Sequence, residues 1–477
     1  MSLSQPENKT ATNDTNKPHN ALKPRSGKAR SLTPSTLIFS NAELQRYAAR
    51  LQRMIRCKTI SVKDSYDDTE FAKLRAVMAE LFPLVHEKAE KLTFSDDCWI
   101  YRLPGKDTSR NIMLMSHHDV VAADGSWDHD PFAAEIAGGK LWGRGTVDTK
   151  TPLFAEFSAL EELLTEGYEP PCNIWIGSSH NEELGDDGIP TAFEYFKKND
   201  ISFEVILDEG GAVIEPPIGG MNCEKCAMVA VHEKGRYKLQ CVAAATGGHA
   251  SLTGASKSTP TERMAGFIHK ITTKNVFTRR LNPQVSAMFT GLAPYCGFPM
   301  NMLLGNLWLF GGIIKKVMPK LNPQAGGLIG TTCAFTDLAT APDRSCTCTV
   351  MLRSVDEQDM YKDIEALKAV AAEYGIEVTV LPESEYHGPA DMTRPQFAYT
   401  MDCIQTIFPQ YPAAPMILPA GTDARTLTDI CPCVLRFAPI TLSKQQLGSV
   451  HSENENIDLR SIGEAVAFYK YFVKNYR

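Results

Sequence analysis

Apolar and polar positions alternate along the first half of the chain in a way that predicts alternating helices and strands. After Ser40, which opens an expected capping box at 40–43, apolar residues recur at helical spacing up to residue 55. Three short apolar runs with strand character follow at 112–115, 174–176 and 205–207, and a helical pattern at 153–165 separates the first two. This order is typical of βαβ units with a buried, largely parallel sheet.

A polar cluster follows each of the three apolar runs. The clusters occupy 116–119, 180–183 and 208–209 and contain His, Asp and Glu. Ligands of open α/β sheets bind beyond the carboxyl ends of the strands. We therefore expect the three clusters to converge on one crevice, although they are far apart in the sequence.

Changes in this pattern divide the chain into four segments. Residues 1–37 are polar and basic and are expected to form a disordered tail. Residues 38–229 form the first part of an α/β catalytic domain, 230–388 an inserted α+β domain, and 389–477 the second part of the catalytic domain. The expected later elements are strands at 237–243, 346–352, 376–381 and 434–437, and helices at 357–373, 397–407 and 457–476.

The inserted segment carries a hydrophobic stretch at 303–314 that allows three interpretations. It is a lipid-facing flap, an acyl-binding wall or, the interpretation we favour, ordinary packing within the second domain. The longest apolar run is interrupted by Asn and Gly and is shorter than the ~20 residues of a spanning helix. We therefore expect no membrane partner.

Composition narrows the class of protein further. The 477 residues include 49 Lys and Arg against 56 Asp and Glu, and the net charge of −7 argues against nucleic acid as a partner. The 13 cysteines are an odd number and too few for a disulfide scaffold, so we expect reduced thiols in a cytoplasmic protein.

Two histidines and three carboxylates stand out as candidate metal ligands. Four of them have an ordinary explanation in isolation, such as a tight turn, an exposed acidic loop or a surface histidine. The exception is Asp208, which ends a buried strand and needs a partner because burying an unpaired charge is costly. Together, imidazole and carboxylate ligands suit zinc, and one bridging carboxylate describes a two-metal hydrolytic site with ions ~3.5–4 Å apart. The set is His117, Asp148, Glu183, Asp208 and His451.

Eight segments in this order resemble the di-zinc metallopeptidase family of aminoacylase, carboxypeptidase G and carboxypeptidase S. They are LMSHHDVV, W-x-H-D-P-F, LWGRGTVDTK, HNEELGDDG, VILDEGG, GGHAS, GTDAR and HSENENI. The resemblance covers nearly everything from about residue 40 to 477 and is strongest for the carboxypeptidase S (Gly-Xaa carboxypeptidase) branch. It implies a mainly parallel-sheet zinc-hydrolase domain with helices on both faces, and an inserted ferredoxin-like lid that serves as a homodimer interface.

The resemblance also implies the metal ligands. His117 and Asp208 would bind one zinc ion, Glu183 and His451 the other, and Asp148 would bridge them. Co²⁺ or Mn²⁺ can substitute for Zn²⁺ at such nitrogen and oxygen ligands.

The resemblance assigns four further roles. Asp119 would orient His117, and Glu182 would be the general base that takes a proton from the metal-bound water. His249 would stabilise the oxyanion, and Arg353 would pair with a substrate carboxylate. The departures from the family pattern are Asn181, Thr149 and a shortened stretch at 337–344. That stretch helps to shape the acyl pocket in relatives, so its shortening puts substrate preference and dimer geometry in question.

The expected activity is zinc-dependent hydrolysis of a short Gly-Xaa peptide by a metal-bound hydroxide, with release of the C-terminal amino acid. Hydrolysis of an N-acyl amino acid is the alternative, and the residues do not separate the two. A non-catalytic metal-binding homologue and an aminopeptidase are the remaining hypotheses.

Overall fold

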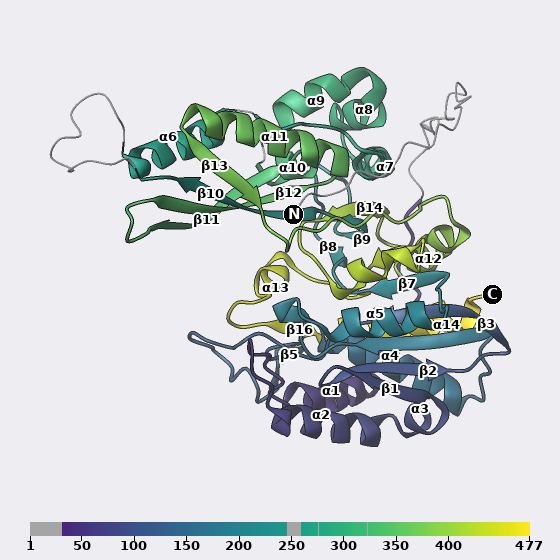
Figure 1. Cartoon of the computed structure of the whole chain (residues 1–477). Coiled ribbons are helices and arrows are strands. Elements are labelled where there is room, and N and C mark those ends of the chain that lie inside the picture. Colours follow the sequence, from purple (N-terminus) through teal and green to yellow (C-terminus); the bar gives the residue numbers. More distant parts are fainter. Residues whose placement is uncertain (1–30, 246–258, 275, 322) are drawn as a thin grey trace.

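The computed structural model describes residues 31–245, 259–274, 276–321 and 323–477, which form a large α/β part and a smaller α+β part. Figure 1 shows the smaller part above the larger one. Most of the expected tail at 1–37 lies outside the described residues, and His249 does too.

A nine-stranded sheet forms the centre of the large part. Its strand order is β1-β2-β6-β3-β7-β15-β9-β14, and β8 pairs with β9. The four central strands are mutually parallel, whereas β2 and β9 run antiparallel to their central neighbours. The strands are β1 (Glu90–Phe94), β2 (Cys98–Leu103), β3 (Asp107–Met115), β6 (Cys172–Ser178), β7 (Val205–Asp208), β8 (Val213–Ile214), β9 (Cys226–Glu233), β14 (Ala413–Leu418) and β15 (Val434–Arg436). The prediction of a mainly parallel α/β sheet is confirmed.

Helices cover both faces of this sheet. One face packs against α1 (Asn41–Ile55), α2 (Asp68–Leu81), α3 (Pro83–Lys88), α4 (Lys150–Thr165), α12 (Pro395–Ile407) and α14 (Leu459–Asn475). The other face packs against α5 (Gly188–Lys198) and the 3₁₀ segment η4 (Asp423–Asp429). Because helices lie on both sides, β6 and β7 are buried along their whole length, which explains their unbroken apolar runs.

The small part is a four-stranded antiparallel sheet with two helices. The strands β10 (Gly235–Ala243), β11 (Thr332–Thr340), β12 (Cys346–Ser354) and β13 (Ile376–Val380) have the spatial order β11-β12-β10-β13. With α6 (Pro260–Thr273) and α11 (Glu357–Glu373), they follow the β-α-β-β-α-β order of ferredoxin-like domains. The change of sheet falls between Glu233 and Gly235, and the sequence-based boundaries at 230 and 388 stay predictions.

Four helices are inserted between α6 and β11, and they pack differently from our expectation. They are α7 (Pro283–Leu292), α8 (Met300–Gly305), α9 (Leu307–Leu321) and α10 (Pro323–Leu328). Their inner side chains share a core with Cys226 and Met228 of β9 and with Ala414 and Ile417 of β14. The hydrophobic stretch at 303–314 therefore packs on the edge of the large sheet and not within the core of the small one.

A third, small sheet joins distant parts of the chain. The strands β16 (Asn456–Asp458) and β5 (Lys140–Trp142) pair antiparallel, and β5 also pairs with β4 (Ile136–Ala137). The last helix, expected from residue 457, begins at Leu459 because the preceding residues form β16. This pairing brings the HSENENI and GRGTVD segments side by side.

Two further observations concern the chain as a whole. All 13 cysteines are free thiols. Among the described residues, no helix is both long enough and apolar enough to span a bilayer.

Candidate active site

The polar clusters expected to converge do so at the carboxyl ends of β3, β6 and β7. His117 follows β3, Glu183 lies in the 3₁₀ turn η1 (Glu182–Leu184) after β6, and Glu209 follows β7. Asp148 precedes α4, and His451 lies in the turn before β16. Five ligand-type side chains from five segments thus meet at one edge of the sheet.

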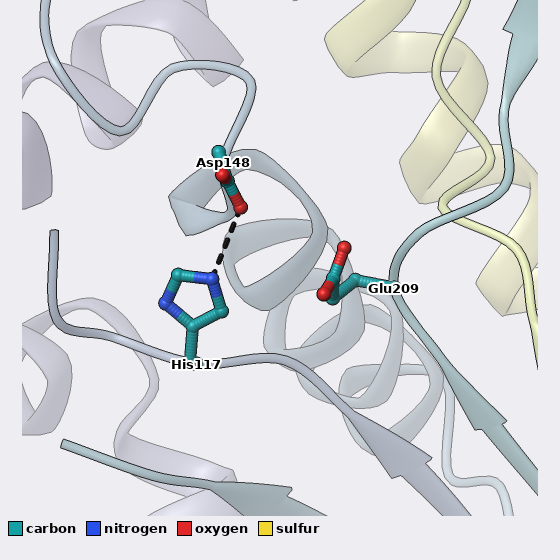
Figure 2. A group of neighbouring side chains, drawn as sticks. All are labelled: His117, Asp148 and Glu209. Carbon is teal, nitrogen blue, oxygen red and sulfur yellow. Dashed lines mark hydrogen bonds and ion pairs between the residues drawn. The ribbon is translucent and has the colours of Figure 1, made fainter. Parts of the chain in front are cut away.

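Asp148 connects two groups of ligand-type side chains. One group is His117, Asp148 and Glu209, and the other is Asp148, Glu183 and His451, with the ligand atoms of each group within 4.8 Å of one another. The two oxygens of Asp148 lie 3.0 Å from His117 Nε2 and 3.0 Å from His451 Nε2. Figure 2 shows Asp148 and Glu209 pointing toward the His117 ring. The shared position of Asp148 is the arrangement that a bridging carboxylate requires.

The structure differs from the sequence prediction at Asp208. Its Oδ2 accepts a hydrogen bond from the N–H of Ala424 at 3.1 Å, and its Oδ1 accepts from the N–H of Glu209. Successive side chains at the end of a strand point to opposite sides, so Asp208 faces η4 while Glu209 faces His117. In this structure Glu209 and not Asp208 lies in the cluster, and the ligand role of Asp208 stays a prediction.

The donor set fits two divalent cations. Each group offers one imidazole nitrogen and two carboxylates when Asp148 is shared, and such nitrogen and oxygen ligands suit zinc. Glu183 Oε1 is buried without any hydrogen-bond partner. A buried carboxylate oxygen without a donor is costly, and a cation would satisfy it.

The charges of the cluster shift its pKa values strongly. Burial lowers the pKa of His117, but hydrogen bonds to Asp119 and Asp148 outweigh burial and raise it well above the usual value. Hydrogen bonds to Asp148 and Glu183 raise the pKa of His451 to about 10. Both imidazoles are therefore in their cationic, doubly protonated form at neutral pH when no metal ion is present. A metal ion must displace a proton from each of them to bind.

Asp119 contacts both sides of the cluster. Its Oδ1 lies 3.2 Å from His117 Nδ1, and its two oxygens accept hydrogen bonds from the backbone N–H groups of Glu182 and Glu183. Asp119 is fully buried. The same carboxylate can thus orient the imidazole and fix the turn that carries two glutamates.

Glu182 sits in an environment that favours its neutral form. Burial raises its pKa well above the usual value, and the carboxylates of Asp423, Asp119 and Asp148 add to this against the opposing charge of His117. A carboxyl group with a raised pKa can accept a proton near neutral pH, as a general base must.

Two cavities meet at this cluster. One, of about 240 Å³, is polar and lies toward the small part, where Arg236, Arg353 and Arg425 line it. The other, of about 380 Å³, is lined mostly by apolar residues: Ala212, Leu418, Ala438, Ile440, Leu442, Leu447 and Val450. Both cavities include Glu182, Glu183 and His451 in their walls. The cluster therefore lies at the junction between a polar cavity, which both arginines and glutamates line, and an apolar one.

Arg353 has the surroundings of an anion-binding residue. It lies opposite Arg236 in the β10–β12 pairing, and its Nη1 donates to the Pro419 carbonyl at 3.1 Å. Burial, with the nearby charges of Arg236 and Arg425, lowers its pKa. Within the described ranges, Arg353 forms no ion pair with a carboxylate, so it is free to bind an anionic ligand.

Glu455 is a site residue that our sequence analysis missed. Its fully buried carboxylate accepts hydrogen bonds from Arg144 Nη1 at 2.6 Å and from the N–H groups of Gly145 at 3.1 Å, Val147 at 2.7 Å and Asp148 at 3.2 Å. It fixes the turn that presents Asp148. The sequence evidence for Glu455 was its position in the HSENENI segment, from which we selected only the histidine as a candidate ligand.

We predict that Glu455→Gln weakens the fold and disorders the turn before Asp148. A glutamine amide would face backbone donors and would leave Arg144 buried without its charge partner, so the free energy of unfolding should fall by about 3 kcal/mol. Urea unfolding of metal-free protein measures this loss. The control is Glu453→Gln, two residues away and exposed, which should change stability by less than about 1 kcal/mol. Equal effects of the two changes would contradict the role of Glu455.

Comparisons with known proteins found relatives of similar length and a solved structure of similar fold. A probable carboxypeptidase S-like protein of Dictyostelium discoideum is 28% identical over 446 residues, covering 90% of this chain and 84% of the relative. An N-fatty-acyl-amino acid synthase/hydrolase of Xenopus tropicalis is 27% identical over 462 residues, covering 92% and 88%. The solved structure of an M20 family metallo-carboxypeptidase from Sulfolobus solfataricus shares the fold, with a TM-score of 0.62, 16% identity and coverage of 90% and 98%.

The family model described as Peptidase family M20/M25/M40 matches residues 113–475, which is most of the chain and includes every ligand-type residue of the cluster. The chain therefore belongs to Peptidase family M20/M25/M40 and is a metal-dependent hydrolase of that family.

Proposed function

We propose that this hydrolase cleaves the amide bond next to a free carboxylate and releases a C-terminal amino acid. The observation that carries the proposal is the place of the cluster, between a cavity lined by arginines and an apolar one. A short peptide is the first candidate substrate, in keeping with the carboxypeptidase S-like relative. The apolar cavity favours a second candidate, an N-acyl amino acid with an apolar acyl group, in keeping with the Xenopus relative.

The metal ligands follow from the two groups of side chains. His117 and Glu209 would hold one divalent cation, Glu183 and His451 the other, and Asp148 would bridge them. The donor set favours zinc, with Co²⁺ or Mn²⁺ as substitutes. When bound, the cations supply Lewis acidity toward the substrate carbonyl and lower the pKa of water.

The protein's own side chains carry the proton and orient the substrate. Glu182 takes a proton from the attacking water at a carboxylate oxygen and delivers it to the amide nitrogen of the leaving amino acid. Arg353 binds the substrate carboxylate through its guanidinium group. The apolar cavity holds the acyl side, so the scissile bond lies at the junction of the two cavities.

We predict that Glu182→Gln lowers kcat by about 100- to 10,000-fold, because glutamine has nearly the same shape but cannot accept the proton. Bound metal should stay at two ions per chain. Steady-state kinetics and elemental analysis measure the two quantities. The exposed neighbour variant Glu194→Gln should keep full activity. Unchanged kcat in the Glu182 variant would exclude it as the base.

We predict that Glu209→Ala lowers bound metal from two ions to one per chain, since one group loses a ligand while the other stays intact. Asp208→Asn should retain both ions because that carboxylate bonds to backbone N–H groups instead. Elemental analysis after dialysis against zinc compares the two variants. Loss of metal only in the Asp208 variant would return the ligand role to Asp208.

We predict that Arg353→Ala raises KM about 10- to 150-fold for substrates with a free carboxylate, because a charge-assisted hydrogen bond is lost. A panel of Gly-Leu, N-acetyl-leucine, a long-chain N-acyl-leucine and the matching leucinamides tests this. The amides, which lack the carboxylate, should react poorly with both proteins and show no further loss. Lys362→Ala, on the exposed face of α11, is the control.

The same panel distinguishes the two candidate substrates. Faster hydrolysis of Gly-Leu than of the acyl-leucines supports the peptide, whereas a rate that rises with acyl length supports the N-acyl amino acid. Equal rates for amides and free acids would contradict the role of Arg353 and favour an aminopeptidase.

A further inference from the structure

The inserted helices expose an apolar patch on the outer surface of the molecule. Figure 1 shows α8 and α9 at the edge of the molecule farthest from α1 and α2. The exposed fractions are 77% for Trp308, 57% for Leu309 and 57% for Ile313. We define the apolar patch by six exposed side chains: Phe298, Met302, Trp308, Leu309, Ile313 and Val317.

The aliphatic side chains of the patch form one face of α9, whereas Phe298 precedes α8 and Met302 lies on it. Leu309, Ile313 and Val317 are spaced four residues apart, so they lie on the same side of the helix. The opposite side is already buried, since Ile314 packs into the core that joins the insertion to β9 and β14. Packing within the chain therefore does not explain the outer face. Contiguous exposed apolar surface of this kind marks an interaction site.

In sequence, the inserted segment carries charge of a single sign, and two of its basic residues, Lys270 and Arg280, pair with carboxylates of α11. Residues 263–336 contain eight Lys and Arg and no Asp or Glu, although the chain as a whole carries 56 acidic residues and a net charge of −7. Lys316 and Lys320 are exposed on α9 beside the patch. In the part of the chain that the structure describes, these two lysines have no carboxylate partner. The ligand of this face is therefore expected to be apolar and anionic.

We propose that the apolar patch binds the surface of a bilayer that contains anionic phospholipid. The 15 residues of α9 rise about 22 Å, less than the ~30 Å hydrocarbon core, so the helix would lie in the plane of the interface. The apolar side chains enter the boundary between headgroups and acyl chains, Trp308 sits at the headgroup level, and the lysines reach the phosphates. This proposal revises our sequence-based expectation of no membrane partner and does not depend on the proposed activity.

A second copy of the chain fits this face less well. A two-fold dimer brings the same patch of both subunits together, so the lysines of both subunits would lie within one interface. No acidic side chain within residues 263–336 could balance them. Anionic headgroups supply the missing negative charge without any change in the protein.

Co-sedimentation of the full chain with vesicles tests the proposal. One set of vesicles is phosphatidylcholine alone, and the other contains roughly 30 mole per cent phosphatidylserine. We expect binding to the anionic vesicles to be at least about tenfold stronger than to the neutral ones, and to weaken in concentrated salt. Absence of binding to both vesicles would overturn the proposal.

Surface variants identify the face that binds. The double variant Trp308→Glu with Ile313→Glu should lose at least about tenfold in vesicle affinity, because two charges would enter the apolar boundary. Leu338→Glu, at an exposed apolar position on β11, should bind like the unchanged protein. Lys316→Glu should also weaken binding, whereas Lys362→Glu should not. Equal binding by the double variant and its control would refute the assignment to α9.

Tryptophan fluorescence tests the proposal independently if the double variant does not fold, since it needs only the unchanged protein and the conservative variant Trp308→Phe. Lipid with brominated acyl chains should quench tryptophan fluorescence, and Trp308→Phe should bind vesicles but lose most of that quenching. Trp99 and Trp175 are buried, Trp142 lies in β5 of the large part, and Trp127 stacks on Arg144 there. Binding without quenching would place another surface at the membrane. A dimer that the double variant abolishes, with no vesicle binding, would show that a second copy covers the patch.

Discussion

One carboxylate, Asp148, faces two imidazoles at the same time, and two more carboxylates lie close by. Taking such charges out of water is costly unless opposite charge balances them. Two protonated histidines or two dications can provide that balance. The backbone must still hold the groups together against their mutual repulsion, and the buried Glu455 does so by accepting hydrogen bonds from the turn before Asp148.

The rest of the fold serves this arrangement. Parallel strands end at one edge of the large sheet, so residues after β3, β6 and β7 meet there without long loops. The small part adds cationic side chains to one wall of the site, and the large part adds apolar ones to the other. A substrate that is anionic at one end and apolar at the other matches both walls.

Much of this architecture could be predicted because buried strands have continuous apolar runs in the sequence. The runs at 112–115, 174–176 and 205–207 are continuous because helices cover both faces of their strands. By contrast, β1 lies at the edge of the sheet and is half exposed, and its short mixed sequence gave no comparable pattern. The helix α11 was predicted at its observed ends, since Asp356 caps it and a regular apolar face follows.

The site was harder to predict where side-chain direction decides. Asp208 and Glu209 are adjacent acidic residues, so residue type does not show which of them faces the cluster. The alternation of side chains at the end of β7 decides this. For the same reason, the apolar residues of 303–314 could be identified, but not which of them face the core and which face outward. The role of Glu455 depends on a contact across 307 residues of sequence, which no local pattern reveals.

The pairing of β16 with β5 has a consequence for how the protein is made. Asp148 and Glu455 lie 307 residues apart, so at about 5 to 20 residues per second the ribosome adds the second roughly 15 to 60 s after the first. During that interval β3, β6, β7 and Glu182 can already be in place, while His451 and the carboxylate beneath Asp148 are absent. The residues from 418 to 450 that line the apolar cavity are made only near the end of it. The nascent chain is therefore inactive until the segment around His451 leaves the ribosome and packs against the site. Metal binding can be completed only after that step.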